Sequence, residues 1–86
     1  MVEKNVVVTN ETGLHARPAA ALVQFVKAMP GEVELVKEGK VANAKSIFSV
    51  MSLGISKGTE INVRVNGENE EENLDKIVQF IEDLKD

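Results

Sequence analysis

The spacing of hydrophobic and polar positions divides the first half of the chain into a strand, a helix and a hairpin. Residues 2–9 are rich in valine and predict a strand. From Ala16 the apolar positions recur every three or four residues, which indicates a helix that ends before Pro30. Residues 32–37 and 40–43 flank a Glu-Gly turn, and we expect them to pair as a β-hairpin.

The second half continues with a short helix, a strand and a longer helix. Ser46 is a typical N-cap, and the apolar run behind it predicts a short helix closed by Gly54. Residues 61–65 alternate between apolar and polar, as in a half-buried strand. Asn69, with a glutamate three residues later, has the pattern of a capping box for a last helix whose apolar stripe ends at Leu84. The predicted order is therefore β-α-β-β-α-β-α.

This order predicts a two-layered α+β fold. Each strand has one apolar face and each long helix has one apolar stripe. An antiparallel sheet with helices on one face and water on the other buries both kinds of surface. The chain has 86 residues, a length that supports a single core, so we expect one domain over residues 1–86.

Composition excludes several classes of function. The chain has no cysteine, which removes disulfides, thiolate zinc sites and cysteine nucleophiles. It has a single histidine, so a multi-histidine metal site is excluded, and we expect neither a metal nor a cofactor. Three aromatic residues and a net charge of −4 argue against a nucleic-acid partner. No apolar run is long enough to span a membrane and the N-terminus does not resemble a signal peptide, so we expect a cytoplasmic protein without membrane insertion.

The candidate chemistry lies in the segment that leads into the first long helix. His15 precedes this helix, whose unpaired N–H groups and dipole favour an anion. Arg17 offers a guanidinium suited to phosphate oxygens, and Thr12 and the backbone of Ala16 complete an anion cradle. The sequence contains no phosphate-binding P-loop motif. We therefore expect His15 to receive a phosphoryl group from another protein and to pass it to another protein.

Two blocks of the sequence resemble one family. Residues 13–19, Gly-Leu-His-Ala-Arg-Pro-Ala, resemble the active-site signature of the HPr family, the histidine phosphocarriers of the bacterial phosphoenolpyruvate-dependent sugar phosphotransferase system. Residues 43–54 resemble the serine-site region of that family, and the likeness covers essentially the whole chain. The resemblance implies an open-faced β-sandwich, in which three helices lie over a four-stranded antiparallel sheet.

The resemblance also implies roles for individual residues. His15 would accept a phosphoryl group from Enzyme I on Nδ1 and donate it to enzyme IIA domains, and Arg17 would assist both transfers. The protein would thus be a covalent intermediate of a relay and not an enzyme. Ser46 would be the target of an ATP-dependent HPr kinase/phosphorylase, after which such proteins bind a catabolite-control repressor and accept phosphate less well at the histidine. Ser49 and Ala44 depart from residues common in the family, which leaves recognition at the serine site open.

The apolar run after Ser46 is too long for a short helix to bury on one face. We expect Ile47 or Phe48, and also Met51, to be partly exposed. Flanked by Lys45 and Arg17, these side chains would form one docking surface for several partners. Because a carrier has to present its site to successive partners, we expect a monomer.

Three other functions fit the same residues. The first is a purely regulatory protein that acts on a catabolite repressor through phosphorylated Ser46, with His15 vestigial. The second is the nitrogen-branch paralogue, which has the same chemistry and different partners. The third is a structural or ligand-sensing α+β domain. A regulatory paralogue within the family lacks the active-site histidine, so the presence of His15 argues against that paralogue.

Overall fold

Seven elements appear in the order that the sequence predicts. The computed structural model describes residues 1–85, and Asp86, the last residue of the predicted domain, lies outside the described residues. None of the helices within residues 1–85 has the length and hydrophobicity that crossing a membrane requires. The elements are β1 (Val2–Val7), α1 (Ala16–Lys27), β2 (Glu32–Lys37), β3 (Lys40–Asn43), α2 (Ile47–Ser52), β4 (Glu60–Asn66) and α3 (Glu70–Glu82).

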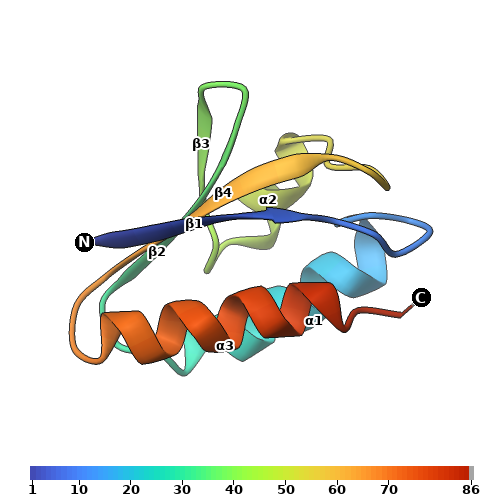
Figure 1. Cartoon of the computed structure of the whole chain (residues 1–86). Coiled ribbons are helices and arrows are strands. Elements are labelled where there is room, and N and C mark those ends of the chain that lie inside the picture. Colours follow the sequence, from blue (N-terminus) through green and yellow to red (C-terminus); the bar gives the residue numbers. More distant parts are fainter. Residues whose placement is uncertain (86) are drawn as a thin grey trace.

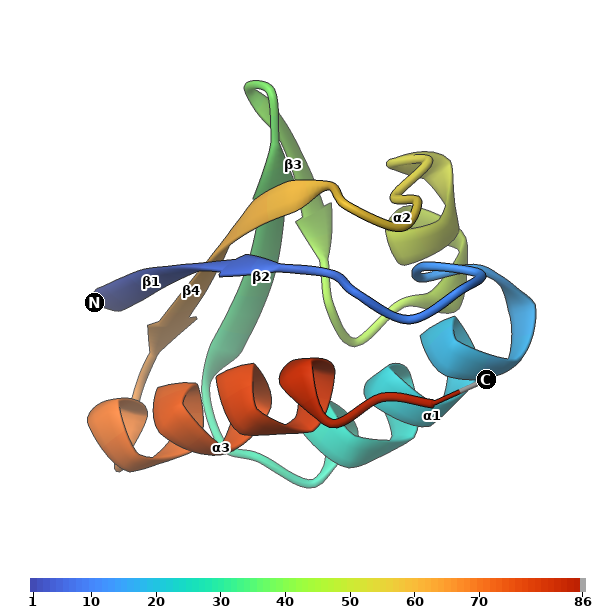
Figure 2. The ribbon, with the colours of Figure 1, turned by 45° about the vertical axis from the view of Figure 1, so that its right-hand side comes forward.

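The four strands form one antiparallel sheet in the order β1-β4-β2-β3. The register places Val33 opposite Val65 and Leu35 opposite Val63, so apolar side chains of neighbouring strands share one face. Figures 1 and 2 show α1 and α3 side by side on this face. The short α2 contacts both β3 and α1. The predicted α+β class and the open-faced arrangement of helices over an antiparallel sheet are confirmed.

The two long helices pack on the sheet through the stripes that their spacing predicted. All four stripe positions of α1 are buried, and in α3 only Leu84, beyond the end of the helix, stays partly exposed. The rings of Phe25 and Phe80 stack with centroids 4.5 Å apart and join the two helices. Each buried valine, leucine or isoleucine side chain contributes about 1.5–3 kcal/mol. The buried stripe residues are Ala19, Leu22, Val23, Val26, Leu74, Ile77, Val78 and Ile81.

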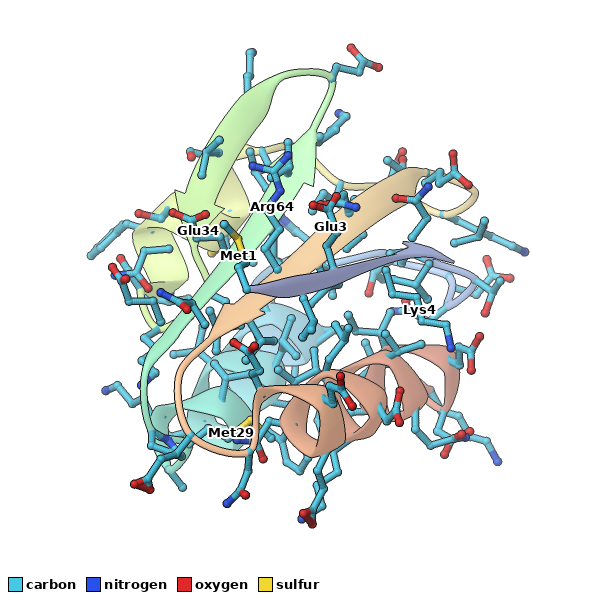
Figure 3. The ribbon with its side chains drawn as sticks, turned by 60° about the vertical axis from the view of Figure 1, so that its left-hand side comes forward. Met1, Glu3, Lys4, Met29, Glu34 and Arg64 are labelled. Atoms are coloured by element: carbon cyan, nitrogen blue, oxygen red, sulfur yellow. The ribbon has the colours of Figure 1, made fainter. Side chains whose placement is uncertain are left out.

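The outer face of the sheet is polar, as expected for a sheet covered on one side. Asn62 Nδ2 donates to Asn5 Oδ1 at 2.9 Å, and Arg64 Nε donates to Asn62 Oδ1 at 2.9 Å. Arg64 lies opposite Glu3 on one neighbouring strand and Glu34 on the other, and Figure 3 shows these side chains together on the outer face. This face therefore stays in contact with water while the opposite face holds the core.

The last helix begins differently from the prediction. Asn69 occupies the N-cap position with φ 57°, and its side chain makes no capping hydrogen bond. A capping side chain needs an extended backbone to reach the first N–H groups, and the left-handed conformation prevents this. Glu70 instead accepts a hydrogen bond from the Gly67 N–H at 3.2 Å and pairs with the amino group of Met1 at 3.3 Å. The capping box predicted at Asn69 is thus wrong.

Two turns cross so closely that one of them requires glycine. Gly31, after α1, has φ 80°, and a Cβ on it would overlap the carbonyl oxygen of Asn66 at the end of β4. Gly39, in the β2–β3 turn, has φ 83° with no heavy atom within 4 Å of the same position. We expect Gly39→Ala to lower the free energy of unfolding by about 1 kcal/mol, the cost of a left-handed alanine. Gly31→Ala should lower it by about 2 kcal/mol more, because the backbone must also move.

Urea denaturation of both variants measures this difference. Because the two glycines have nearly the same φ, the difference between the variants reports the steric contact alone. Equal midpoints for the two variants would show that the two turns do not touch.

Candidate functional site

His15 lies at the end of α1 that attracts anions. It is the N-cap residue, with an extended backbone at φ −124° and ψ 147°, and its side chain is exposed and makes no capping bond. The first turn of α1 carries no acidic residue. The unpaired N–H groups and the positive end of the helix dipole are therefore not neutralised by the helix itself.

The residues predicted to form the anion cradle lie together. Thr12, His15, Ala16 and Arg17, with Pro18, line one hollow at the surface. Arg17 is exposed, and among residues 1–85 no hydrogen bond or ion pair occupies its guanidinium. The imidazole, the guanidinium and the helix terminus thus face a common space. Such a space suits a phosphoryl group, whose oxygens accept hydrogen bonds from the guanidinium and from the helix N–H groups.

Ala16 has a backbone conformation that its sequence does not predict. Its φ of 43° lies in the left-handed region, which costs a non-glycine residue about 1–2 kcal/mol. This one residue turns the chain from the extended conformation at His15 into the helix. Strain of this kind persists only where the surrounding structure holds it, and here the surrounding structure is the loop before the histidine.

That loop is fixed by backbone contacts with the segment that precedes β4. Leu14 is buried, and its N–H donates to the Ile55 carbonyl at 3.0 Å. Gly13 has φ 65°, and a Cβ on it would lie 2.7 Å from Ser56 Cα. Asn10 is buried, and its Nδ2 donates to the Gly13 carbonyl at 2.9 Å. Sequence reasoning missed Asn10 and Ile55; the Asn-x-x-Gly turn was the one signal for Asn10, whereas nothing local indicates Ile55.

Ser46 is the N-cap of α2, as predicted. Its backbone is extended, and its Oγ accepts a hydrogen bond from the Ser49 N–H at 3.4 Å. This distance is long for an N–H···O bond, so the cap is weak. The side chain of Ser46 is partly exposed, and the first turn of α2 has no acidic residue. The hydroxyl therefore lies at a second helix terminus where added negative charge is favoured.

Helix α2 exposes part of its apolar surface. Phe48 is 85% exposed, whereas Ile47 and Met51 are half-buried against the core and Leu53 is buried. In Figures 1 and 2, α2 lies at the same end of the molecule as the start of α1. The expected exposure is thus confirmed, and it places an apolar patch near His15. We refer to Ile47, Phe48 and Met51 as the α2 patch.

The side chain of Lys45 reaches the end of α1 opposite to Arg17. Its Nζ donates to the carbonyls of Met29 at 2.6 Å and Gly31 at 2.9 Å, beyond the C-terminal end of α1. Arg17 is in the first turn of α1, and the two ends of this 12-residue helix are about 18 Å apart. The ammonium thus binds carbonyls of the turn that follows α1, near the negative end of the helix dipole. The Lys45 ammonium and Arg17 thus lie at opposite ends of α1, and their joint role at one docking surface stays a prediction.

No group of three histidine, cysteine, aspartate or glutamate side chains within residues 1–85 is arranged to hold a metal ion. The arrangement at His15 offers instead a nucleophile, hydrogen-bond donors and positive charge. Those are the groups that a transient phosphoryl group requires.

Comparison with known proteins places the chain in a family. The model of the PTS-HPr family, described as the phosphorylation site of the HPr component, matches residues 2–83. The HPr-like protein Crh of Bacillus subtilis is 45% identical over 83 residues, which are 96% of this chain and 98% of the relative. The phosphocarrier protein HPr of Vibrio cholerae is 38% identical over 98% of this chain and 99% of its own.

Solved structures agree with these matches. HPr from Thermoanaerobacter tengcongensis superposes with a TM-score of 0.91 and 41% identity, covering 95% of this chain and 92% of the other. Two similar structures, of Crh from Bacillus subtilis (TM-score 0.76) and of HPr from Thermoanaerobacter tengcongensis (TM-score 0.74), are described as dimers. Because the family model and these relatives span nearly the whole sequence, the chain belongs to the HPr family, the phosphocarrier proteins of the phosphotransferase system.

Proposed function

We propose that His15 carries a phosphoryl group from Enzyme I to enzyme IIA domains of a sugar phosphotransferase system in the cytoplasm. The observation that carries this proposal is the exposed ring at a helix terminus without acidic residues, next to an unoccupied Arg17 guanidinium. The protein is a carrier in this scheme, because it passes the phosphoryl group to the next protein and returns to its original state.

The transfer itself needs few groups. The lone pair of His15 Nδ1 attacks the phosphorus, the bond to the donor residue breaks, and the leaving group retains the electron pair. Negative charge on the phosphoryl oxygens meets Arg17 and the N–H groups at the start of α1, with Thr12 at the side of the hollow. The same steps in reverse deliver the group to the acceptor. The loop before His15, which is fixed by its contacts with residues 55 and 56, keeps the imidazole in place for both partners.

The α2 patch is the docking surface in this proposal. Exposed Phe48 and half-buried Met51 offer apolar contact area that different partners can share. Arg17 supplies positive charge for acidic partners at the same end of the molecule. The ammonium of Lys45 binds backbone at the far end of α1 and thereby holds the loop before α2.

Ser46 is the regulatory site in this proposal. A kinase that uses ATP would place a phosphate at the N-terminus of α2, where the dipole accepts it. The phosphate adds about −1.5 to −2 charges beside the α2 patch, which repels acidic partners without a change of fold. A catabolite-control repressor with basic residues at its surface would be attracted by the same charge.

A purely regulatory role is the second candidate. Crh of Bacillus subtilis, at 45% identity, is described as a catabolite repression HPr, which supports this alternative. The complete cradle around His15 favours the carrier role, because a regulatory role through Ser46 does not require it. We infer that the working form is a monomer, since the site has to face successive partners.

The first prediction concerns His15. Incubation with phosphoenolpyruvate and Enzyme I should label the protein with one acid-labile phosphate, as phosphohistidine is, and His15→Ala should remove the label completely. Ser46→Ala is the control and should keep it. An acid-stable label, or an equal label on His15→Ala, would leave only the regulatory alternative.

The second prediction concerns docking. Phe48→Asp places a charge in the α2 patch and should raise the KM for this protein in transfer from Enzyme I about tenfold. This is the effect of removing an aromatic anchor that becomes buried when the partner docks. Val41→Asp is the matched control, because Val41 is 55% exposed on the edge strand β3, where no docking is proposed. If both variants transfer like the wild type, the partners dock elsewhere.

The third prediction concerns Ser46. With an HPr kinase and ATP, Ser46→Ala should lose the acid-stable phosphate that the wild type acquires. Ser52→Ala changes an exposed serine of the same helix and should be phosphorylated normally. Phosphate that persists on Ser46→Ala would show that the kinase uses another residue.

A further inference from the structure

Helix α2 is too short to keep its shape alone. It has six residues, fewer than two turns, and isolated helices of this length are unstable in water. The last carbonyls of any helix lack partners within the helix, and the last turn of α2 carries no basic residue of its own. The α2 patch therefore depends on contacts from outside the helix.

Lys37 supplies such a contact from the sheet. It is the last residue of β2, and its half-buried side chain reaches the C-terminal end of α2. Its Nζ donates to the Leu53 carbonyl and to the Gly54 carbonyl, both at 3.0 Å. Hydrogen bonds from an ammonium are stronger than neutral ones, and a cation is favoured at a helix C-terminus. One side chain thus fixes the end of α2 to a strand 16 residues earlier in the sequence.

The contact between Lys37 and the end of α2 lies next in sequence to Ile55, which holds the loop before His15. Gly54 is followed by Ile55, whose carbonyl accepts the hydrogen bond from Leu14, the neighbour of His15. Gly13 packs against the backbone of residues 55 and 56. The carbonyls that Lys37 holds therefore lie between the α2 patch and the loop before His15.

Lys40 provides the contrast. It lies opposite Lys37 in the β2–β3 ladder and carries the same charge. The side chain of Lys40 is exposed, and among residues 1–85 it makes no hydrogen bond or ion pair. Lys37 and Lys40 thus carry the same charge at this end of the hairpin, but Lys37 contacts the end of α2 and Lys40 does not.

We propose that Lys37 is a positioning residue for phosphoryl transfer. It holds α2 in a position where Phe48 contacts the partner, and it keeps the loop before His15, residues 10–14, in place. Lys37 does not touch the phosphoryl group. This inference rests on the proposed carrier function, because it assigns Lys37 to the docking step of that function.

Three variants test the proposal: Lys37→Met keeps the length of the side chain without the charge, Lys37→Arg restores a donor, and Lys40→Met is the charge control. In transfer from Enzyme I, Lys37→Met should raise the KM about fivefold and leave kcat within about twofold, because docking and not chemistry is affected. Lys37→Arg should recover most of the loss, and Lys40→Met should match the wild type. If Lys37→Met does not fold, Lys37→Gln, which has a shorter polar side chain without the charge, takes its place in the same comparison.

Hydrogen exchange separates this proposal from the carrier function. The Gly54 N–H donates to the Met51 carbonyl at 3.2 Å, and its exchange should become at least about threefold faster in Lys37→Met if Lys37 holds this end of α2. Unchanged exchange would show that Lys37 does not hold the helix. Faster exchange with an unchanged KM would show a contact that serves stability alone, and either result overturns the proposal. A wild-type protein that takes no phosphate on His15 overturns the carrier function instead, whatever the exchange shows.

Discussion

The positive, unpaired N-terminus of α1 is the feature on which the site depends. A helix that begins with an exposed histidine and has no acid in its first turn leaves its N–H groups for an anion from outside. Arg17 adds a cation to the same hollow. This arrangement favours a negatively charged group on the ring.

Keeping that terminus open requires a rigid support behind it. The left-handed Ala16 would relax if the loop before it could move. The Leu14 N–H donates to the Ile55 carbonyl and Asn10 closes the turn at Gly13, and Leu14, Ile55 and Asn10 are all buried. The core of this small domain therefore serves the site directly: it holds the backbone that positions one exposed imidazole.

The two helices at this end of the molecule use their termini in the same way. His15 and Ser46 are both N-caps with extended backbones and no acid in the turn that follows, so each helix presents a favourable place for phosphate. At the opposite ends, Lys45 holds the carbonyls after α1 and Lys37 those after α2. Anions are thus favoured where the helices begin and cations bind where they end, as the helix dipole dictates.

The sequence predicts the order of the elements, the buried stripes of α1 and α3 and the segment around His15. These features depend on hydrophobic periodicity, turn residues and helix caps, which act over a few neighbouring positions. Contacts between distant segments did not follow from the sequence. Lys45 binds Met29 and Lys37 binds the end of α2, which no local rule indicates. These contacts depend on which backbone carbonyls the folded chain brings within reach of a flexible lysine side chain, and only the tertiary structure decides that.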